Sequence, residues 1–147
     1  MQRLLPPFLF LLAVAAMALL NNYLPIVRLL DHPWTLIGVI DLAGGIAITL
    51  FAGSQFMRAR TNLKTFNDPE KLVTTGLFKY SRNPMYLGFS ISTFGVALYL
   101  GSLTPFFICL LFIFIADRWY IAFEEKKMAE IFGKEYETYK ASVRRWI

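Results

Sequence analysis

The chain has 147 residues, of which 56% are hydrophobic, and its mean hydropathy is +0.50. A composition this apolar excludes a small soluble domain and is typical of a membrane protein. The formal charge of +5 does not indicate nucleic-acid binding, because basic and acidic residues alternate in the C-terminal tail and form no basic stripe.

Four apolar segments approach the length of about 20 residues that a helix needs to cross a bilayer. They predict an all-α fold, an integral membrane bundle of four transmembrane helices in a single domain of residues 1–147. The expected spans are Leu4–Leu20, Trp34–Phe56, Tyr86–Gly101 and Pro105–Phe123.

The first segment also has features of a secretory signal peptide. Arg3 precedes an apolar run, and an Ala-x-Ala sequence ends at Ala18. We expect a membrane span here, with cleavage as the alternative. Cys109 is the only cysteine, so no disulfide framework is expected, and we interpret it as a core residue.

The second and third segments are rich in small residues at helical spacing. Small residues let helices approach closely in a membrane, so we expect these faces to be helix contacts. Asp41, an acid at membrane depth, is expected to be paired or hydrogen-bonded inside the bundle. The small residues are Gly45, Thr49 and Gly53 in the second segment and Gly88, Ser92 and Gly95 in the third.

Basic residues gather in the loop Met57–Tyr80 and after Phe123, whereas the turn Gly101–Thr104 has none. Lys and Arg favour the cytoplasmic side of a membrane, so both basic segments are expected there. With four crossings, both termini are cytoplasmic, in a multi-pass protein of a bacterial-type inner membrane. The residues concerned are Arg58, Arg60, Lys64, Lys71, Lys79, Arg82, Lys126, Lys127, Lys134, Lys140, Arg144 and Arg145.

The tail after Phe123 predicts a cytoplasmic extension of two short amphipathic helices. Apolar residues recur at helical spacing on both sides of Gly133, which suits a helix end. We expect these helices to fold back against the bundle or the membrane surface. The apolar residues are Met128, Ile131, Phe132, Tyr136, Tyr139 and Val143.

The stretch KYSRNPMYLGF lies where the basic loop meets the third apolar segment. Asn is favoured as an N-cap and Pro at the first helical position, so Asn83 and Pro84 predict the start of a helix. The backbone N–H groups of Met85 and Tyr86 would then point into the loop beside Arg82. This arrangement favours an anion site.

Glu124 and Glu125 stand at the matching cytoplasmic end of the fourth segment and would hold a cation. An anion site and a cation site at the same end of the bundle suit a zwitterion, such as an amino-acid group.

With these motifs, the sequence resembles the membrane methyltransferases that include isoprenylcysteine carboxyl methyltransferase and the phospholipid methyltransferases. The resemblance covers about residues 60–147 and rests on LVTTGLFKYSRNPMYLG and the later EEKKMAEIFGKEYETYKASVRRW. The family pattern is an Arg-His-Pro-x-Tyr-x-Gly run followed by a Glu-Glu pair. Asn83 stands where eukaryotic members carry His, and it can donate and accept hydrogen bonds but cannot serve as a protonated group.

The resemblance implies S-adenosylmethionine as cofactor, bound by about residues 70–88 and 118–140, and no metal. The acceptor would be lipophilic or amphipathic, with a carboxylate or thiol favoured and a phospholipid amine as the alternative. By matching position, Leu72 and Val73 would line the adenine and ribose, and Phe78 would pack on the cofactor. Glu124 would bind the ammonium. The implied cofactor residues are Leu72, Val73, Phe78, Arg82, Asn83, Pro84, Met85, Tyr86, Gly88, Glu124 and Glu125.

Arg118 is a candidate substrate-positioning residue, because it precedes Glu124 by about one and a half helical turns and could meet an anionic group. The alternative is that it reaches the interface or pairs with Asp117. His32, the only histidine, lies in the predicted outer loop and is not expected to act as a base.

Two other functions remain open at this point. Sterol reductases share a related C-terminal region, which would make the chain an NADPH-dependent membrane reductase, although its small size and its Glu-Glu pair disfavour this. A non-enzymatic membrane scaffold is the second alternative.

Overall fold

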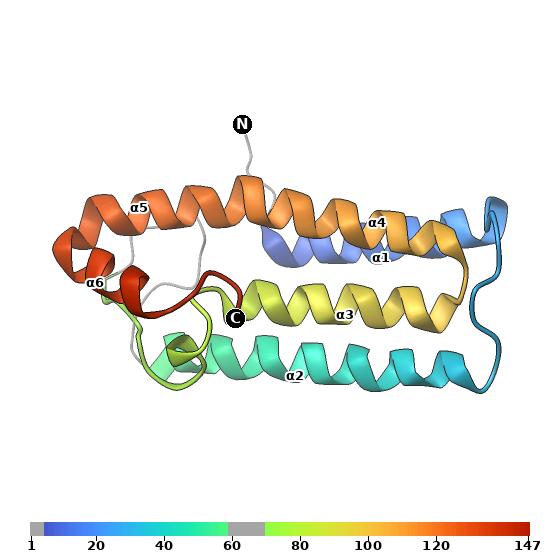
Figure 1. Cartoon of the computed structure of the whole chain (residues 1–147), viewed down its shortest axis with the longest axis horizontal. Coiled ribbons are helices and arrows are strands. Elements are labelled where there is room, and N and C mark those ends of the chain that lie inside the picture. Colours follow the sequence, from blue (N-terminus) through green and yellow to red (C-terminus); the bar gives the residue numbers. More distant parts are fainter. Residues whose placement is uncertain (1–4, 59–69) are drawn as a thin grey trace.

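The computed structural model describes residues 5–58 and 70–147, and these residues form helices joined by loops, with one isolated backbone bridge between Arg28 and Ser102. The all-α prediction is therefore confirmed. Four helices run side by side, with consecutive helices antiparallel (Figure 1). They are α1 (Pro6–Tyr23), α2 (Ile37–Arg58), α3 (Pro84–Leu100) and α4 (Leu103–Ile115).

Within residues 5–58 and 70–147, three helical segments are long and apolar enough to cross a membrane, namely Pro6–Tyr23, Trp34–Arg58 and Leu103–Phe132. The third predicted span, Tyr86–Gly101, corresponds to α3, which is apolar but has only 17 residues and rises about 26 Å. It lies between α2 and α4 (Figure 1).

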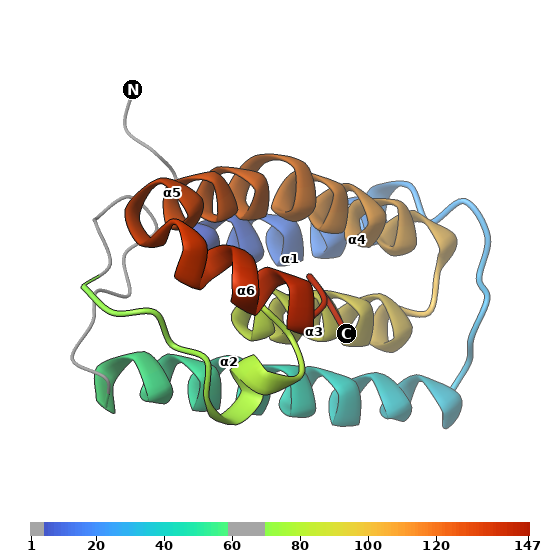
Figure 2. The same cartoon turned by 60° about the vertical axis from the view of Figure 1, so that its left-hand side comes forward.

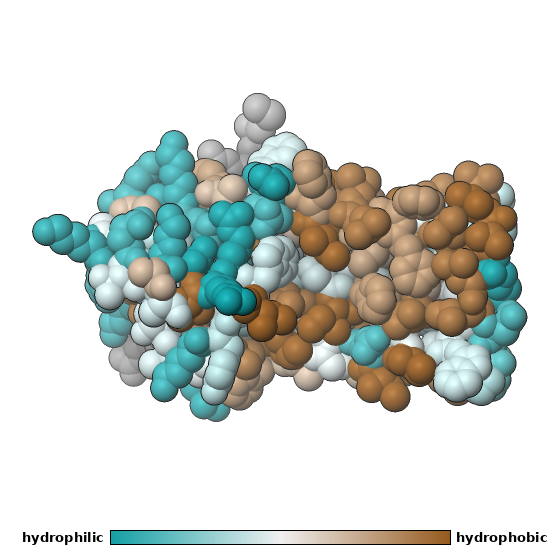
Figure 3. Space-filling model, viewed as in Figure 1, coloured by the Kyte–Doolittle hydropathy of each residue, from teal (hydrophilic) through white to brown (hydrophobic). Residues whose placement is uncertain are grey.

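The surface divides into an apolar and a hydrophilic part (Figure 3). Apolar side chains cover the bundle, whereas hydrophilic ones gather at the end that contains α5 (Ala122–Phe132) and α6 (Lys134–Ser142). A wide apolar surface on long helices identifies an integral membrane protein. Two of the charges used to predict its orientation, Arg60 and Lys64, lie outside the described residues.

Helices α2 and α3 pack with their backbones in contact. A Cβ atom added to Gly88 would lie 2.2 Å from Thr49 Oγ1 and 2.5 Å from the carbonyl oxygen of Gly45. Only a residue without a side chain fits here, so the predicted helix contact is confirmed. Gly53, predicted to share this face, is an exception, because a Cβ there would have nothing within 4 Å.

The prediction for Asp41 was wrong. Its side chain is half-buried on α2, and it makes no hydrogen bond or ion pair with another described residue. Spacing along a helix shows that a residue lies at membrane depth, but not whether a partner stands opposite it.

The helix formed by the fourth apolar segment does not end at Phe123 as predicted. A π-helical turn, Ala116–Ile121, joins α4 to α5 without a break (Figure 1). The 30 residues of Leu103–Phe132 rise about 45 Å, which exceeds a hydrocarbon core of about 30 Å. The charged α5 therefore extends beyond the apolar layer.

Only the second of the two predicted short helices folds back. The chain reverses at Gly133, where φ is +51°, a value that a glycine adopts without strain. From there α6 returns toward the start of α3 (Figures 1 and 2). The start of α3, the start of α5 and the C-terminal tail thus meet at the hydrophilic end of the molecule.

Candidate functional site

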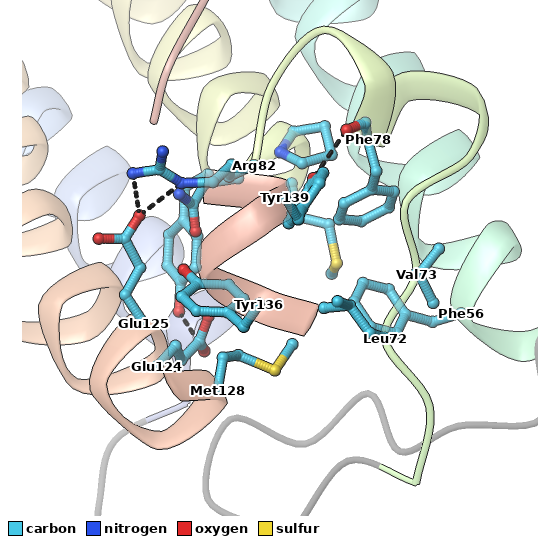
Figure 4. A pocket seen from close by; sticks show the side chains of 14 residues that line it. Phe56, Leu72, Val73, Phe78, Arg82, Glu124, Glu125, Met128, Tyr136 and Tyr139 are labelled. Carbon is cyan, nitrogen blue, oxygen red and sulfur yellow. Dashed lines mark hydrogen bonds and ion pairs between the residues drawn. The ribbon is translucent and has the colours of Figure 1, made fainter. Parts of the chain in front are cut away.

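A cavity of about 70 Å³ lies at the hydrophilic end, lined by the end of α2, the loop before α3, the start of α3, α5 and α6 (Figure 4). Every residue of the predicted cofactor set lines it except Gly88, which packs against α2 instead. The lining residues are Phe56, Leu72, Val73, Phe78, Arg82, Asn83, Pro84, Met85, Tyr86, Glu124, Glu125, Met128, Tyr136 and Tyr139.

The cavity has a charged side and an apolar side. Figure 4 shows Arg82 and the two glutamates on one side and Phe56, Leu72, Val73 and Phe78 on the other. Such a division suits a ligand with a charged end and a flat, weakly polar end.

Tyr86 on α3 and Glu124 on α5 connect the two walls of the charged side. The Tyr86 hydroxyl donates a hydrogen bond of 2.8 Å to Glu124 Oε1. Tyr86 is buried and Glu124 is half-buried, so the bond orients the carboxylate at the cavity wall. A carboxylate held in this way can accept hydrogen bonds from an ammonium group.

Arg82 is largely engaged by the protein itself. Its Nε and Nη2 atoms donate to Glu125 Oε1 at 3.0 and 2.7 Å. Its Nη1 atom donates to the carbonyl oxygens of Lys140 and Val143 at 3.1 and 2.7 Å. An arginine has five N–H donors, so these four bonds leave one for a ligand. The predicted contact with a cofactor carboxylate stays a prediction.

Glu125 holds a cation, as its position suggested, and the cations are arginines of the chain. Arg82 binds one carboxylate oxygen, and Arg145 binds the other through Nη2 at 2.5 Å and Nε at 3.1 Å. Burial acts to raise the pKa of the Glu125 carboxyl, but hydrogen bonds from Arg145 and Arg82 outweigh it and hold this pKa below its usual value. Glu125 is thus a charged anchor within the wall.

Pro84 begins α3 as predicted, but the side chain of Asn83 does not cap that helix. Its Nδ2 atom instead donates to the carbonyl oxygen of Arg145 at 3.1 Å. Ser81 Oγ donates to the same oxygen at 3.4 Å and accepts from the backbone N–H of Asn83 at 3.1 Å. Asn83 therefore binds the C-terminal tail and does not cap α3 as expected.

The π-helical turn places Asp117 beside that tail. Arg145 Nη1 lies 3.3 Å from Asp117 Oδ1, which also accepts from Trp146 Nε1 at 2.9 Å. From the sequence, Asp117 was expected only as a partner of Arg118, and Arg145 and Trp146 were not expected in the site. No local pattern signalled these contacts, since they join residues 28 and 29 positions apart.

Arg118 is not part of the cavity. Its side chain is 74% exposed and lies 3.4 Å from Asp117. The predicted alternative, pairing with Asp117, is thus present in the structure, and the substrate-positioning role stays a prediction.

Four lining residues were missing from the predicted set, namely Phe56, Met128, Tyr136 and Tyr139. The last three belong to the predicted apolar helix faces after Phe123. Their helical spacing was therefore visible in the sequence, but it was interpreted only as packing. The Tyr139 hydroxyl donates to the carbonyl oxygen of Phe78 at 2.7 Å. Burial raises the pKa of Tyr136 to about 12 and also raises that of Tyr139, so both hydroxyls stay neutral at physiological pH.

The chemistry of the lining suits S-adenosylmethionine, because Glu124 can accept from an ammonium and Leu72, Val73 and Phe78 can cover a ring. The volume of about 70 Å³ is below the roughly 300–1,000 Å³ of ligand pockets. Binding would therefore require lining side chains such as Met128 to move.

Comparisons with known proteins find relatives of this chain. A model of the family described as phospholipid methyltransferase matches residues 33–135. The Protein-S-isoprenylcysteine O-methyltransferase of Schizosaccharomyces pombe is 37% identical over 79 residues, which cover 52% of this chain and 33% of that protein. Its namesake from Saccharomyces cerevisiae is 43% identical over 76 residues, which cover 49% and 30%.

An uncharacterized protein of Haemophilus influenzae is 35% identical over 63 residues, which cover 43% of this chain and all of that protein. The matched part of this chain spans about a third of the length of the two yeast relatives. No solved structure matches the chain.

Proposed function

This chain belongs to the phospholipid methyltransferase family, and we propose that it is a membrane methyltransferase that uses S-adenosylmethionine and acts on a lipophilic or amphipathic acceptor. The observation that carries the proposal is the cavity itself. Residues from two motifs about 40 positions apart line one amphipathic cavity at the edge of the apolar layer.

The two sides of the cavity bind different parts of the cofactor. Glu124, oriented by Tyr86, accepts hydrogen bonds from the ammonium of the cofactor. The apolar side, with Leu72, Val73 and Phe78, excludes water from its adenosine. The remaining N–H of Arg82 and the first backbone N–H groups of α3 lie where a carboxylate would be stabilised.

The cofactor supplies an electrophilic methyl group, and the chain supplies position and a dry surrounding. Methyl transfer needs an acceptor atom in line with the methyl carbon, so rigid placement accounts for much of the rate. A carboxylate or thiolate acceptor loses its negative charge in this step, which a water-poor site favours. Such an acceptor also needs no base, and His32 lies in the loop at the opposite end of the bundle (Figure 1).

We also propose four membrane crossings with both termini cytoplasmic. This topology puts the cavity at the cytoplasmic interface, where a lipophilic acceptor reaches it from the bilayer. Cysteine labelling of intact cells tests it. A cysteine at Lys71 must be protected from an impermeant reagent, whereas one at Asp31 must react.

Titration calorimetry of the purified chain in detergent tests the function. We expect binding of S-adenosylmethionine and of its demethylated product, and none of NADPH. Binding of NADPH alone would support a reductase, and binding of none of the three would support a scaffold.

Methyl transfer with labelled cofactor then identifies the acceptor. The names of the yeast relatives favour a prenylated cysteine carboxylate, and the family description favours a phospholipid amine. Vesicles that contain one or the other separate the two, since base treatment releases the label from a methyl ester but not from an N-methyl group.

A further inference from the structure

The C-terminal tail, Val143–Ile147, joins the two walls of the cavity. It lies against the start of α3 on one side and against α5 and the π-helical turn on the other. Within this tail, Arg145 contacts both walls at once, and nothing in the sequence motifs of the site assigns it a role.

The backbone of Arg145 is attached to the α3 wall. Its carbonyl oxygen accepts from Asn83 Nδ2 at 3.1 Å and from Ser81 Oγ at 3.4 Å. Next to it, the carbonyl oxygen of Arg144 accepts from the backbone N–H of Arg82 at 3.0 Å. The tail backbone is thus aligned along the residues that precede α3.

The side chain of Arg145 is attached to the opposite wall. Its guanidinium donates twice to Glu125 Oε2 and reaches Asp117 with Nη1. The carboxylate side chains are 10% and 19% exposed, and that of Arg145 is 35% exposed. A planar guanidinium with several fixed donors can bind two carboxylates simultaneously, which the single ammonium of a lysine does less well.

We propose that the Arg145 side chain is a positioning residue that sets the spacing between the α3 wall and the α5 wall, and thereby the fit of the cofactor's amino-acid group. The inference rests on the proposed function. In that function Glu124 on α5 holds the ammonium and the start of α3 faces the carboxylate, so the two charges are held by different walls. Phe56 and Leu72, which would face the adenosine, lie across the cavity from Arg82 and the two glutamates (Figure 4). The Arg145 side chain contacts Glu125 and therefore acts at the charged side.

The test compares two neighbouring arginines by titration calorimetry of the full chain in detergent. Arg145→Ala removes the bridge but keeps the backbone carbonyl, and we expect about 10- to 100-fold weaker binding of S-adenosylmethionine. Arg144→Ala is the matched control, because Arg144 is exposed and only its backbone makes a described contact. Its affinity should stay within about twofold of the wild type.

A second ligand separates positioning from general damage. The probe 5′-methylthioadenosine has the adenosine and the sulfur but no amino-acid group, so Arg145→Ala should bind it as the wild type does. An irreversibly unfolded fraction would instead lower the number of binding sites for both ligands and leave the remaining affinity unchanged, whereas reversible unfolding would weaken both ligands equally. Equal weakening of both ligands, or unchanged affinity for S-adenosylmethionine, overturns the proposal.

Arg145→Lys covers the case in which Arg145→Ala does not fold. It keeps the charge but loses the planar fork, and we expect about 3- to 10-fold weaker binding of S-adenosylmethionine. Wild-type affinity in this variant contradicts the positioning role. A wild-type chain that fails to bind S-adenosylmethionine overturns the proposed function and this inference together, whereas normal wild-type binding with unaffected Arg145 variants overturns only the inference.

Discussion

Two contacts of α3, one with α2 and one with α5 and the tail, are built in opposite ways. Against α2, Gly88 brings the backbones together at the level of Gly45 and Thr49. Against α5 and the tail, contact is made by hydrogen-bonded and charged side chains around a cavity. Close-packed backbones resist displacement, whereas side-chain bonds can break and re-form. The first contact is therefore the fixed part of the molecule, and the second is the part that can adjust to a ligand.

The largest effect is expected from a substitution at the fixed contact. Gly88→Val places a side chain where a Cβ alone would lie 2.2 Å from Thr49 Oγ1, and overpacking of this kind costs about 3 kcal/mol of folding free energy. Gly53→Val is the control, since a Cβ at Gly53 meets nothing within 4 Å, and it should change stability by less than about 0.5 kcal/mol. Thermal unfolding in detergent measures both, and similar midpoints would show that the α2–α3 contact is adjustable.

The next effect belongs to the cavity. Glu124→Gln removes the charge that faces the ammonium, and we expect binding of S-adenosylmethionine to weaken by about 1.5 to 3 kcal/mol, as for a hydrogen bond to a charged group. Glu130→Gln on the same helix is the control, because Glu130 pairs with Lys126 at the surface. Equal affinities in the two variants would remove Glu124 from the binding site.

A smaller effect follows from removing the group that orients Glu124. Tyr86→Phe deletes the 2.8 Å hydrogen bond but keeps the ring, so cofactor affinity should fall by about 1 kcal/mol. Tyr80→Phe serves as the control, since Tyr80 is 73% exposed. If calorimetry finds no loss for Tyr86→Phe, the carboxylate is held by other contacts.

The contact between Asn83 and the tail allows a comparable test. Asn83→Ala loses the bond to the Arg145 carbonyl and should reduce stability and cofactor affinity by about 0.5 to 1.5 kcal/mol. Asn83→His, the residue of the eukaryotic members, can donate from a ring nitrogen and should retain both. A histidine variant as weak as the alanine variant would contradict this role.

The smallest effect is expected at Arg118. Its side chain is 74% exposed and its ion pair with Asp117 is at the surface, so Arg118→Ala should change cofactor affinity and stability by less than about 0.5 kcal/mol. A large loss of methyl transfer with unchanged cofactor affinity would support the predicted substrate-positioning role of Arg118.

Much of the site could be predicted because its residues belong to two short motifs. Leu72, Val73, Phe78 and residues 82–86 line the cavity together with the glutamate pair, as the resemblance implied. Gly88 belongs to the same motif but lies two helical positions beyond Tyr86, on the face that meets α2. Membership of a motif thus did not distinguish a cofactor contact from a helix contact.

The sequence by itself determined the properties that depend on neighbouring residues. Apolar runs of sufficient length specify helices for a membrane, because backbone groups in lipid must bond within their own segment. Likewise, Pro84 begins α3 and Gly133 ends α5, since proline and glycine restrict or relax the local backbone.

Only the tertiary structure decided which side chains meet. Gly45 and Gly53 each lie four positions from Thr49, yet of these two glycines only Gly45 faces α3. Arg82 donates to Glu125, which lies 43 positions away in the sequence, and Asn83 donates to the Arg145 carbonyl, which lies 62 positions away. The first pair depends on how α5 packs beside the start of α3, and the second on the return of the chain through α6. Long-range contacts of this kind follow from the packing of the whole chain, because no local periodicity encodes them.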